Sequence, residues 1–271
     1  FHQLRRKSLE YAKQMFNRAI EIDPDYALAH AGVADCCSLL YMYFDARELN
    51  LRQADLSSSK ALELEPDLAE AHVARGLAVS LNKHYDEAAK EFETAMKLDP
   101  KLYEAAYFFA RARLSQGQPL EAAKLFERAS ALRPEDYQAP ALLGQAYHAA
   151  GREVDARNSY RRAAQLAEER IELNPDDARA LMMGAVSVAA LGEQQHAIDL
   201  VNRAVAMDPD DAGILYNIAC AYSSLGKPDE SIAALERAVD KGYAHKEWME
   251  NDPDLEPIRN TPRYQALLQV M

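Results

Sequence analysis

Histidine, cysteine and paired acidic residues are the side chains of this 271-residue sequence that could bind a metal or perform catalysis. The histidines, at positions 2, 30, 72, 84, 148, 196 and 245, include no pair with the helical spacing of metal ligands. The cysteines form no Cys-x-x-Cys pair, and the sequence has no glycine-rich phosphate loop and no Gly-x-Ser-x-Gly motif. A catalytic group assembled from distant residues stays open. The motifs themselves predict no enzyme, no metal site and no cofactor.

The paired acids have a structural explanation. Asp176–Asp177 and Asp210–Asp211 each follow a proline directly. Acidic side chains at the start of a helix accept hydrogen bonds from free backbone N–H groups and interact favourably with the helix dipole. We therefore expect these pairs to cap helices.

Net charge narrows the class of partner. The chain has 31 Lys and Arg residues against 43 Asp and Glu residues, a net charge of −12. This sign disfavours a phosphate backbone. The short basic clusters Arg5–Lys7 and Arg161–Arg162 fit solvated faces better than a nucleic-acid site. The sequence predicts no nucleic-acid partner and favours a neutral or basic protein segment.

The cysteine count indicates a reducing compartment. Cys36 and Cys37 are adjacent and the total of three is odd, which argues against a disulfide framework and for buried thiols. The sequence shows no signal peptide and no uninterrupted apolar run long enough to cross a membrane. We expect a cytoplasmic protein without membrane insertion, and its oligomeric state stays open.

The same helix-ending pattern recurs six times. Its clearest copies are ALELEP at 61–66, AMKLDP at 95–100, ASALRP at 129–134 and AVAMDP at 204–209. Proline ends a helix because it lacks an N–H group and disfavours helix at the preceding residue. The closing prolines are Pro24, Pro66, Pro100, Pro134, Pro175 and Pro209, so the steps are 42, 34, 34, 41 and 34 residues. A period of this length predicts a solenoid of repeated helix pairs.

Small residues and rings recur at fixed places in each unit, where two helices must approach closely. One position holds Gly76, Ala110, Gly144 and Ala219, and another holds the rings Phe92, Phe126 and Tyr160. Gly117, Gly151, Gly192 and Gly226 supply the turns between paired helices. The pattern predicts a partial repeat at 1–26, six units at 27–66, 69–100, 103–134, 137–175, 178–209 and 212–242, and a cap at 243–271.

This arrangement of small residues, rings and prolines resembles the tetratricopeptide repeat (TPR) family over residues 8–242. Arg75, Val201 and Leu235 depart from the family pattern. The resemblance implies an all-α, right-handed α–α superhelix in which the first helix of each pair lines a concave face. That face is where solenoids bind partners.

The resemblance also implies which side chains point toward a partner. Repeat positions two, five, six and nine face inward, and here they include Glu104, Tyr107, Phe108, Arg111, Gln138, Gln145, Arg179, Met182, Met183, Tyr216 and Asn217. Methionines beside aromatic rings suit an adaptable peptide-binding lining. The alternative is that these residues form core between repeats. Asn217 has no matching lysine on the preceding first helix, so the lysine–asparagine clamp for chaperone termini is not expected.

Two steps are longer than the basic period. Eight extra residues lie between Ala34 and Ala54, where Asp45 and Glu48 predict a capping box that starts the second helix near residue 46. The aromatic stretch 41–44 beside it either packs on neighbouring repeats or forms an exposed apolar contact. The second irregular step predicts one long helix running on past Ala163.

The two ends depart from the repeat. Residues 1–5 read as the tail of a first helix, so we expect a fragment of a longer protein. At the other end, Thr261 and Pro262 predict the start of a helix. The apolar residues expected to cover the last repeat are Trp248, Leu255, Ile258, Tyr264 and Leu267.

The tail GY…W…DPDLEPIRNTPRYQALL is similar to the segment that closes TPR regions in bacterial signalling proteins. In those proteins the TPR region follows a Ser/Thr protein kinase, a nucleotide cyclase or a DNA-binding regulator. We therefore expect an interaction scaffold within a larger signalling protein. The alternative is a structural assembly factor of envelope or secretion machinery.

Overall fold

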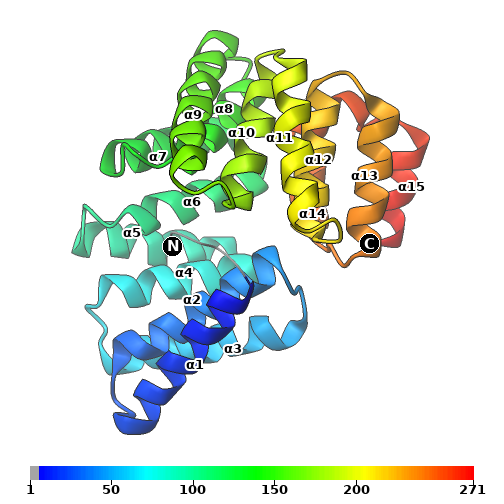
Figure 1. Cartoon of the computed structure of the whole chain (residues 1–271). Helices are drawn as coiled ribbons and strands as arrows, with labels where there is room; N and C mark the ends of the chain where they lie inside the picture. The colour runs from blue at the N-terminus through cyan, green and yellow to red at the C-terminus, as the bar shows by residue number, and fades with distance from the viewer. Residues whose placement is uncertain (1–5) are drawn as a thin grey trace. The chain divides into compact units, whose positions relative to one another are not determined.

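The computed structural model describes residues 6–271, and within them fifteen α-helices and one 3-10 helix follow one another without a strand (Figure 1). The predicted helix tail at residues 1–5 lies outside the described residues. The predicted all-α class, built of tandem helix pairs, is confirmed. The chain divides into two compact units, residues 1–112 (unit 1) and 113–271 (unit 2).

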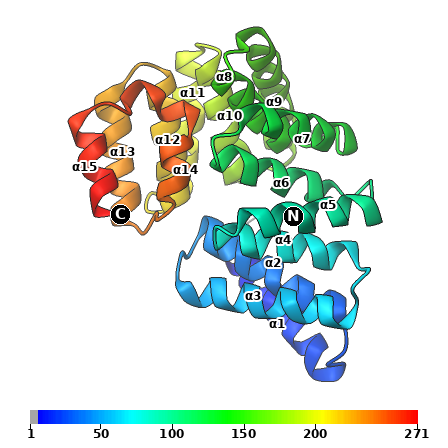
Figure 2. The ribbon, with the colours of Figure 1, turned by 180° about the vertical axis from the view of Figure 1, so that it is seen from behind.

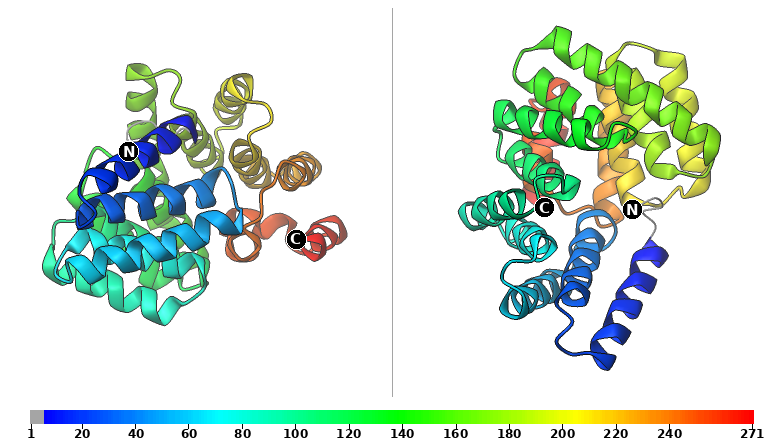
Figure 3. Two further views of the ribbon diagram at one scale, coloured as in Figure 1. Left: turned by 90° about the horizontal axis from the view of Figure 1, so that it is seen from below. Right: turned by 90° about the vertical axis from the view of Figure 1, so that its left-hand side faces the viewer.

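Unit 1 is built from consecutive antiparallel helices. They are α1 (Arg6–Ile22), α2 (Ala27–Tyr43), α3 (Glu48–Leu64), α4 (Ala69–Leu81), α5 (Tyr85–Leu98) and most of α6 (Tyr103–Ser115). The first five pack in succession, and the first helices α2 and α4 also contact each other. Figure 3 shows α1 lying along α2.

Unit 2 continues with the same hairpins and then departs from them. Its helices are α7 (Pro119–Leu132), α8 (Gln138–Ala149), α9 (Glu153–Leu173), α10 (Ala178–Ala190), α11 (Gln194–Met207), α12 (Ala212–Ser224) and α13 (Pro228–Asp240). The tail, residues 246–271, adds α14 (Lys246–Asn251), the 3-10 helix η1 (Pro253–Ile258) and α15 (Pro262–Val270). In Figure 2 the tail turns back along α12 and α13, and η1 contacts both α12 and α8.

Glycine ends the first helix of four pairs, as predicted. Gly117, Gly151, Gly192 and Gly226 have φ between 68° and 85°, a left-handed conformation that glycine adopts without strain from a side chain. In the α4–α5 hairpin the same conformation falls on Lys83, with φ of 65°.

The paired helices approach closely where a ring covers a glycine. A Cβ atom added to Gly76 would lie 2.9 Å from the Phe92 ring, and one added to Gly144 would lie 2.6 Å from the Tyr160 ring. Phe92 and Phe126 are fully buried, and Tyr160 is 3% exposed. The small-residue and ring positions predicted from the sequence therefore form the contact between the two helices of a pair.

Helix starts follow the predicted caps in unit 2 but not at Asp45. The carboxylates of Asp177 and Asp211 accept hydrogen bonds from backbone N–H groups of α10 and α12, and Thr261 caps α15. The predicted capping box at Asp45 is wrong. Helix α3 begins at Glu48 instead, because the Asp45 carboxylate is engaged by the Arg47 guanidinium.

The extra residues in the two long repeat units belong largely to longer helices. Helix α2 runs for 17 residues to Tyr43, and α9 runs for 21 residues, which confirms the predicted long helix. The aromatic stretch 41–44 is partly buried, and the Arg111 guanidinium lies 5.5 Å from the centre of the Tyr43 ring. This contact reaches a later repeat of unit 1, as the packing interpretation expects.

Replacing Gly76 by alanine should lower the free energy of unfolding by about 1–3 kcal/mol, because the new methyl group overlaps the Phe92 ring. Adding Phe92→Leu should recover part of that loss, since the two sites share one space. Urea unfolding of the two single variants and the double variant measures this coupling. Strictly additive losses would show that the ring does not limit the approach of α4 and α5.

Candidate functional site

In unit 1 the candidate residues lie on α6, and they form a stacked aromatic group. The Tyr103 and Tyr107 rings are 5.3 Å apart and nearly parallel, and the Phe108 ring stands edge-on to Tyr107 at 5.3 Å. The Arg111 guanidinium lies 6.0 Å from the Tyr107 ring centre. Tyr107 and Phe108 are buried, as the core interpretation expects, whereas Glu104 and Arg111 are partly exposed.

Asp35 lies close enough to Glu70 and Glu104, which belong to the next two first helices, for their negative charges to disfavour its ionisation. Asp35 comes from α2, Glu70 from α4 and Glu104 from α6. The Asp35 side chain keeps part of its surface in solvent, but its Oδ1 atom is buried and has no hydrogen-bond partner among the described residues. Burial, together with the negative charges of Glu104 and Glu70, raises the pKa of Asp35 to about 8. We call these three residues the acidic group.

Sequence reasoning missed Asp35 and Glu70, although the signal was present. Asp35 and Glu70 stand at repeat positions nine and two, which the TPR resemblance places on the inner face. What the sequence could not show was that the carboxyl groups converge across three helices.

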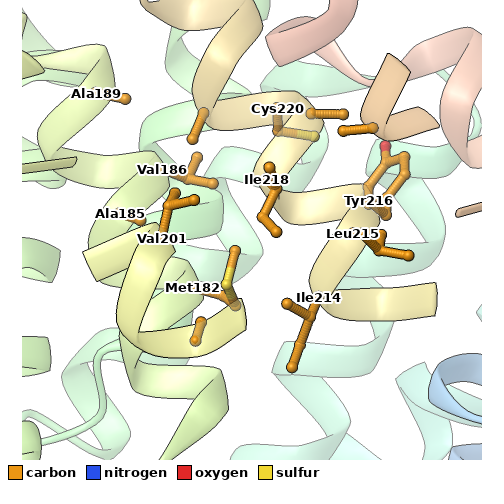
Figure 4. Packing of buried hydrophobic residues seen from close by; sticks show 14 of the residues in the cluster. Met182, Ala185, Val186, Ala189, Val201, Ile214, Leu215, Tyr216, Ile218 and Cys220 are labelled. Atoms are coloured by element: carbon orange, nitrogen blue, oxygen red, sulfur yellow. The ribbon is translucent and has the colours of Figure 1, made fainter. Parts of the chain in front are cut away.

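In unit 2 the candidate residues are tied to the fold. The Arg179 guanidinium on α10 donates to the Gln138 side chain on α8, and the Asn217 amide donates to the Gly213 carbonyl oxygen of its own helix, at 2.8 Å. Met182 is 3% exposed. Figure 4 shows Met182 in the apolar packing between α10 and α12, and Met183 packs against the edge of the same core.

Gln145 and Tyr216 bind the tail. The Tyr216 hydroxyl donates to the Asp252 carboxylate at 2.5 Å, and the Gln145 amide donates to the Asp254 carboxyl. Both tail acids are nearly fully buried, and burial raises the pKa of each. The side chains of Gln145 and Tyr216 are therefore hydrogen-bonded to the chain's own C-terminal tail.

Apolar burial holds the tail in place. Met249, Leu255, Ile258 and Tyr264 are fully buried in the same core as α10 to α13. The Tyr264 hydroxyl donates to the Met249 carbonyl oxygen at 2.7 Å. The Asn251 amide donates to the carbonyl oxygen of Ser115, the last residue of α6, at 2.9 Å, which links α14 to that helix end. The tail is therefore an integral part of unit 2.

Within the described part of the chain, one group of side chains has the donor atoms of a metal site. The Cys220 thiol and the Asp252 and Asp254 carboxyl oxygens all lie within 4.8 Å of one another. Cys220 and the tail acids are 32 and 34 positions apart in sequence, so no spacing motif could reveal them.

Comparison with known families agrees with this architecture. Models described as tetratricopeptide repeat match residues 69–102, 113–160, 153–212 and 212–240, more than half of the chain. The chain belongs to the tetratricopeptide repeat family. No curated protein matches the sequence.

Several solved structures share the fold at low sequence identity. The human IFIT1 dimer with m7Gppp-AAAA is 17% identical, with a TM-score of 0.65 over 97% of this chain and 66% of that one. The Cut9–Hcn1 heterotetramer of the APC/C is 17% identical, with a TM-score of 0.60 over 99% of this chain and 46% of that one. TTC0263, a thermophilic TPR protein of Thermus thermophilus, is 24% identical, with a TM-score of 0.52 over 74% of this chain and all of that one. The chain thus spans less than two thirds of the first two relatives.

None of the described helices combines the length and apolar character needed to cross a membrane.

The acidic group makes the stability of unit 1 depend on pH. The folded pKa of Asp35 is higher than its unfolded value of about 3.9, so proton binding favours the folded state. Its contribution is present below the unfolded pKa and is lost as pH rises to about 8. The urea midpoint of Asp35→Asn, relative to that of the unaltered protein, should therefore rise from about pH 5 to pH 8 and then level off. A difference independent of pH would contradict this charge arrangement.

Truncating Leu255 to alanine should destabilise unit 2 by about 2–5 kcal/mol, because the side chain is fully buried between the tail and α12. Val270→Ala is the matched control, since Val270 is 77% exposed in the same tail. Its effect should stay within about 0.5 kcal/mol. Thermal unfolding compares the two, and equal melting temperatures would show that the tail adds no core.

Proposed function

We propose that this chain is a protein-interaction scaffold and that unit 1 binds a peptide or protein segment through the face carrying the acidic group. The supporting observation is the convergence of Asp35, Glu70 and Glu104 beside the α6 aromatic group. A cation from a partner would favour the ionised form of Asp35, which burial and the charges of Glu104 and Glu70 disfavour. The proposal assigns a neutral or basic segment as the partner, in line with the net charge of −12.

Unit 2 has a different role in this proposal. Its candidate residues Gln145 and Tyr216 are already engaged by the tail, whose removal would expose several fully buried side chains. In this proposal unit 2 does not bind the partner and serves as a stable part of the scaffold. Of the eleven candidate residues, Glu104 and Arg111 on α6 remain the proposed direct contacts, and the buried Tyr107 and Phe108 rings support them.

We further propose that the scaffold is a regulatory, cytoplasmic part of a larger bacterial signalling protein. The support is the similarity of the tail to segments that close TPR regions in such proteins. The alternative is an assembly factor of envelope or secretion machinery. Determining the complete gene distinguishes them: a kinase, cyclase or DNA-binding domain in the same polypeptide supports the first, and an export signal or lipid attachment motif supports the second.

Neutralising the acidic group should weaken binding of a basic partner. A fluorescent lysine- and arginine-containing peptide library, with an acidic library as comparison, supplies the probes. The double variant Glu70→Gln/Glu104→Gln should bind selected basic peptides about tenfold more weakly, a loss of about 1.4 kcal/mol, and with a smaller salt dependence. Glu93→Gln, an exposed acid on α5, is the control and should leave binding unchanged. Selection of acidic peptides, or equal losses in both variants, would contradict the proposed surface.

A further inference from the structure

A buried polar cluster joins the tail to the body of unit 2. Cys220 is on α12, Gln145 on α8 and Tyr160 on α9, while Asp252 and Asp254 belong to the tail. All five are at most 8% exposed. Burying so many polar groups is costly unless each is paired or coordinates an ion.

The donor set fits a zinc-type cation. Zinc in proteins takes thiolate sulfur at about 2.3 Å and carboxylate oxygen at about 2.0–2.2 Å, usually with four ligands. The Cys220 sulfur is 3.9 Å from the Asp252 Oδ2 atom, and the three donor atoms lie within 4.8 Å of one another. Ligands of one zinc ion must all lie within these bond lengths of it, so the three donor atoms would have to draw in around the ion.

Unsatisfied oxygen atoms provide the independent observation. The Gln145 amide N–H donates to Asp254, so this side chain points into the cluster, yet its Oε1 atom is buried and has no hydrogen-bond partner among the described residues. The Tyr160 hydroxyl is also buried without a hydrogen-bond partner among the described residues. It lies close enough to Asp252 and Asp254 for their charges to add to the effect of burial in raising its pKa. A buried oxygen without a partner costs about 1–3 kcal/mol. In the site proposed below, Gln145 Oε1 is assigned as the fourth ligand.

The charge balance also calls for a cation. Burial disfavours the ionised forms of Asp252 and Asp254, and as metal ligands the two would place two negative charges in a buried region. Arg259, the nearby positive side chain, donates to the Asp252 backbone carbonyl oxygen at 2.8 Å, and its charge favours the ionised form of Asp252. A thiolate at Cys220 would add a third negative charge, which a divalent ion neutralises.

The surrounding hydrogen bonds match those that orient metal ligands. Asp252 accepts from the Tyr216 hydroxyl and from the Asp254 backbone N–H at 3.0 Å, and the Gln145 amide holds Asp254. Ligating carboxylates are commonly fixed in this way by outer groups. These contacts hold both carboxyl groups beside the sulfur.

We propose that Cys220, Asp252 and Asp254, completed by Gln145, form a structural zinc site that fastens the tail to unit 2. Three ligands come from two segments, α12 and the tail, so binding the ion links them directly. Because coordination requires the folded arrangement, the binding free energy adds to the stability of unit 2. The site is separate from the acidic group of unit 1.

The test uses the full chain. Metal is removed with a chelator under reducing conditions, and Zn²⁺ or Co²⁺ is then added back. We expect one equivalent to bind to unit 2, a melting temperature that rises with Zn²⁺, and a near-ultraviolet sulfur-to-cobalt charge-transfer band with Co²⁺. Cys220→Ser should abolish the band and weaken Zn²⁺ binding at least about a hundredfold. Cys36→Ser changes a buried thiol of unit 1 and should leave both signals intact.

The variant Asp254→Asn distinguishes a bound metal ion from a proton shared between the Asp252 and Asp254 carboxyl groups. A neutral amide weakens a metal ligand, so this variant should lose the melting-temperature rise with Zn²⁺ while staying folded without metal. If the two carboxyl groups are instead held by a proton, the unaltered protein will bind no Zn²⁺ and Asp254→Asn will match or exceed its stability. That result, or a cobalt band that survives in Cys220→Ser, would overturn the proposal.

Discussion

The close approach of paired helices, with a ring set over a small residue, is the constraint on which this structure depends. Phe92 over Gly76 and Tyr160 over Gly144 leave no room for a single added methyl group. This contact fixes how the two helices of a pair lie on each other. It therefore also fixes which face of each first helix does not pack against its paired helix. Residues on that face then either pack within the fold, as Met182 does, or stay partly exposed, as Glu104 and Arg111 do.

The two units use that remaining face differently. In unit 2 it receives the tail, whose acids are bonded to Gln145 and Tyr216 and whose apolar side chains complete the core. In unit 1 it carries the acidic group, including a buried Asp35 oxygen without a hydrogen-bond partner among the described residues. One repeat architecture thus provides a unit closed by its own tail and a unit that we propose as the binding site for a partner.

Much of the fold could be predicted from the sequence because its signals are local. Proline stops, turn glycines and the caps at Asp177, Asp211 and Thr261 each act within a few residues. Asp45 failed as a cap because a neighbouring guanidinium competed for its carboxylate. The convergence of the acidic group and the bond between Gln145 and Asp254, 109 positions apart, depend on tertiary packing, which single-sequence periodicity does not encode.

Hydrogen exchange with and without a bound basic peptide tests the central claim most directly. The measurement follows the backbone amides of α2, α4 and α6 and, in the same experiment, those of η1 and α15. The account predicts that the peptide slows exchange in the three first helices of unit 1 and leaves the tail unchanged. Slower exchange in η1 with none in α2, α4 or α6 would contradict it, because the partner would then bind the unit that the tail already closes.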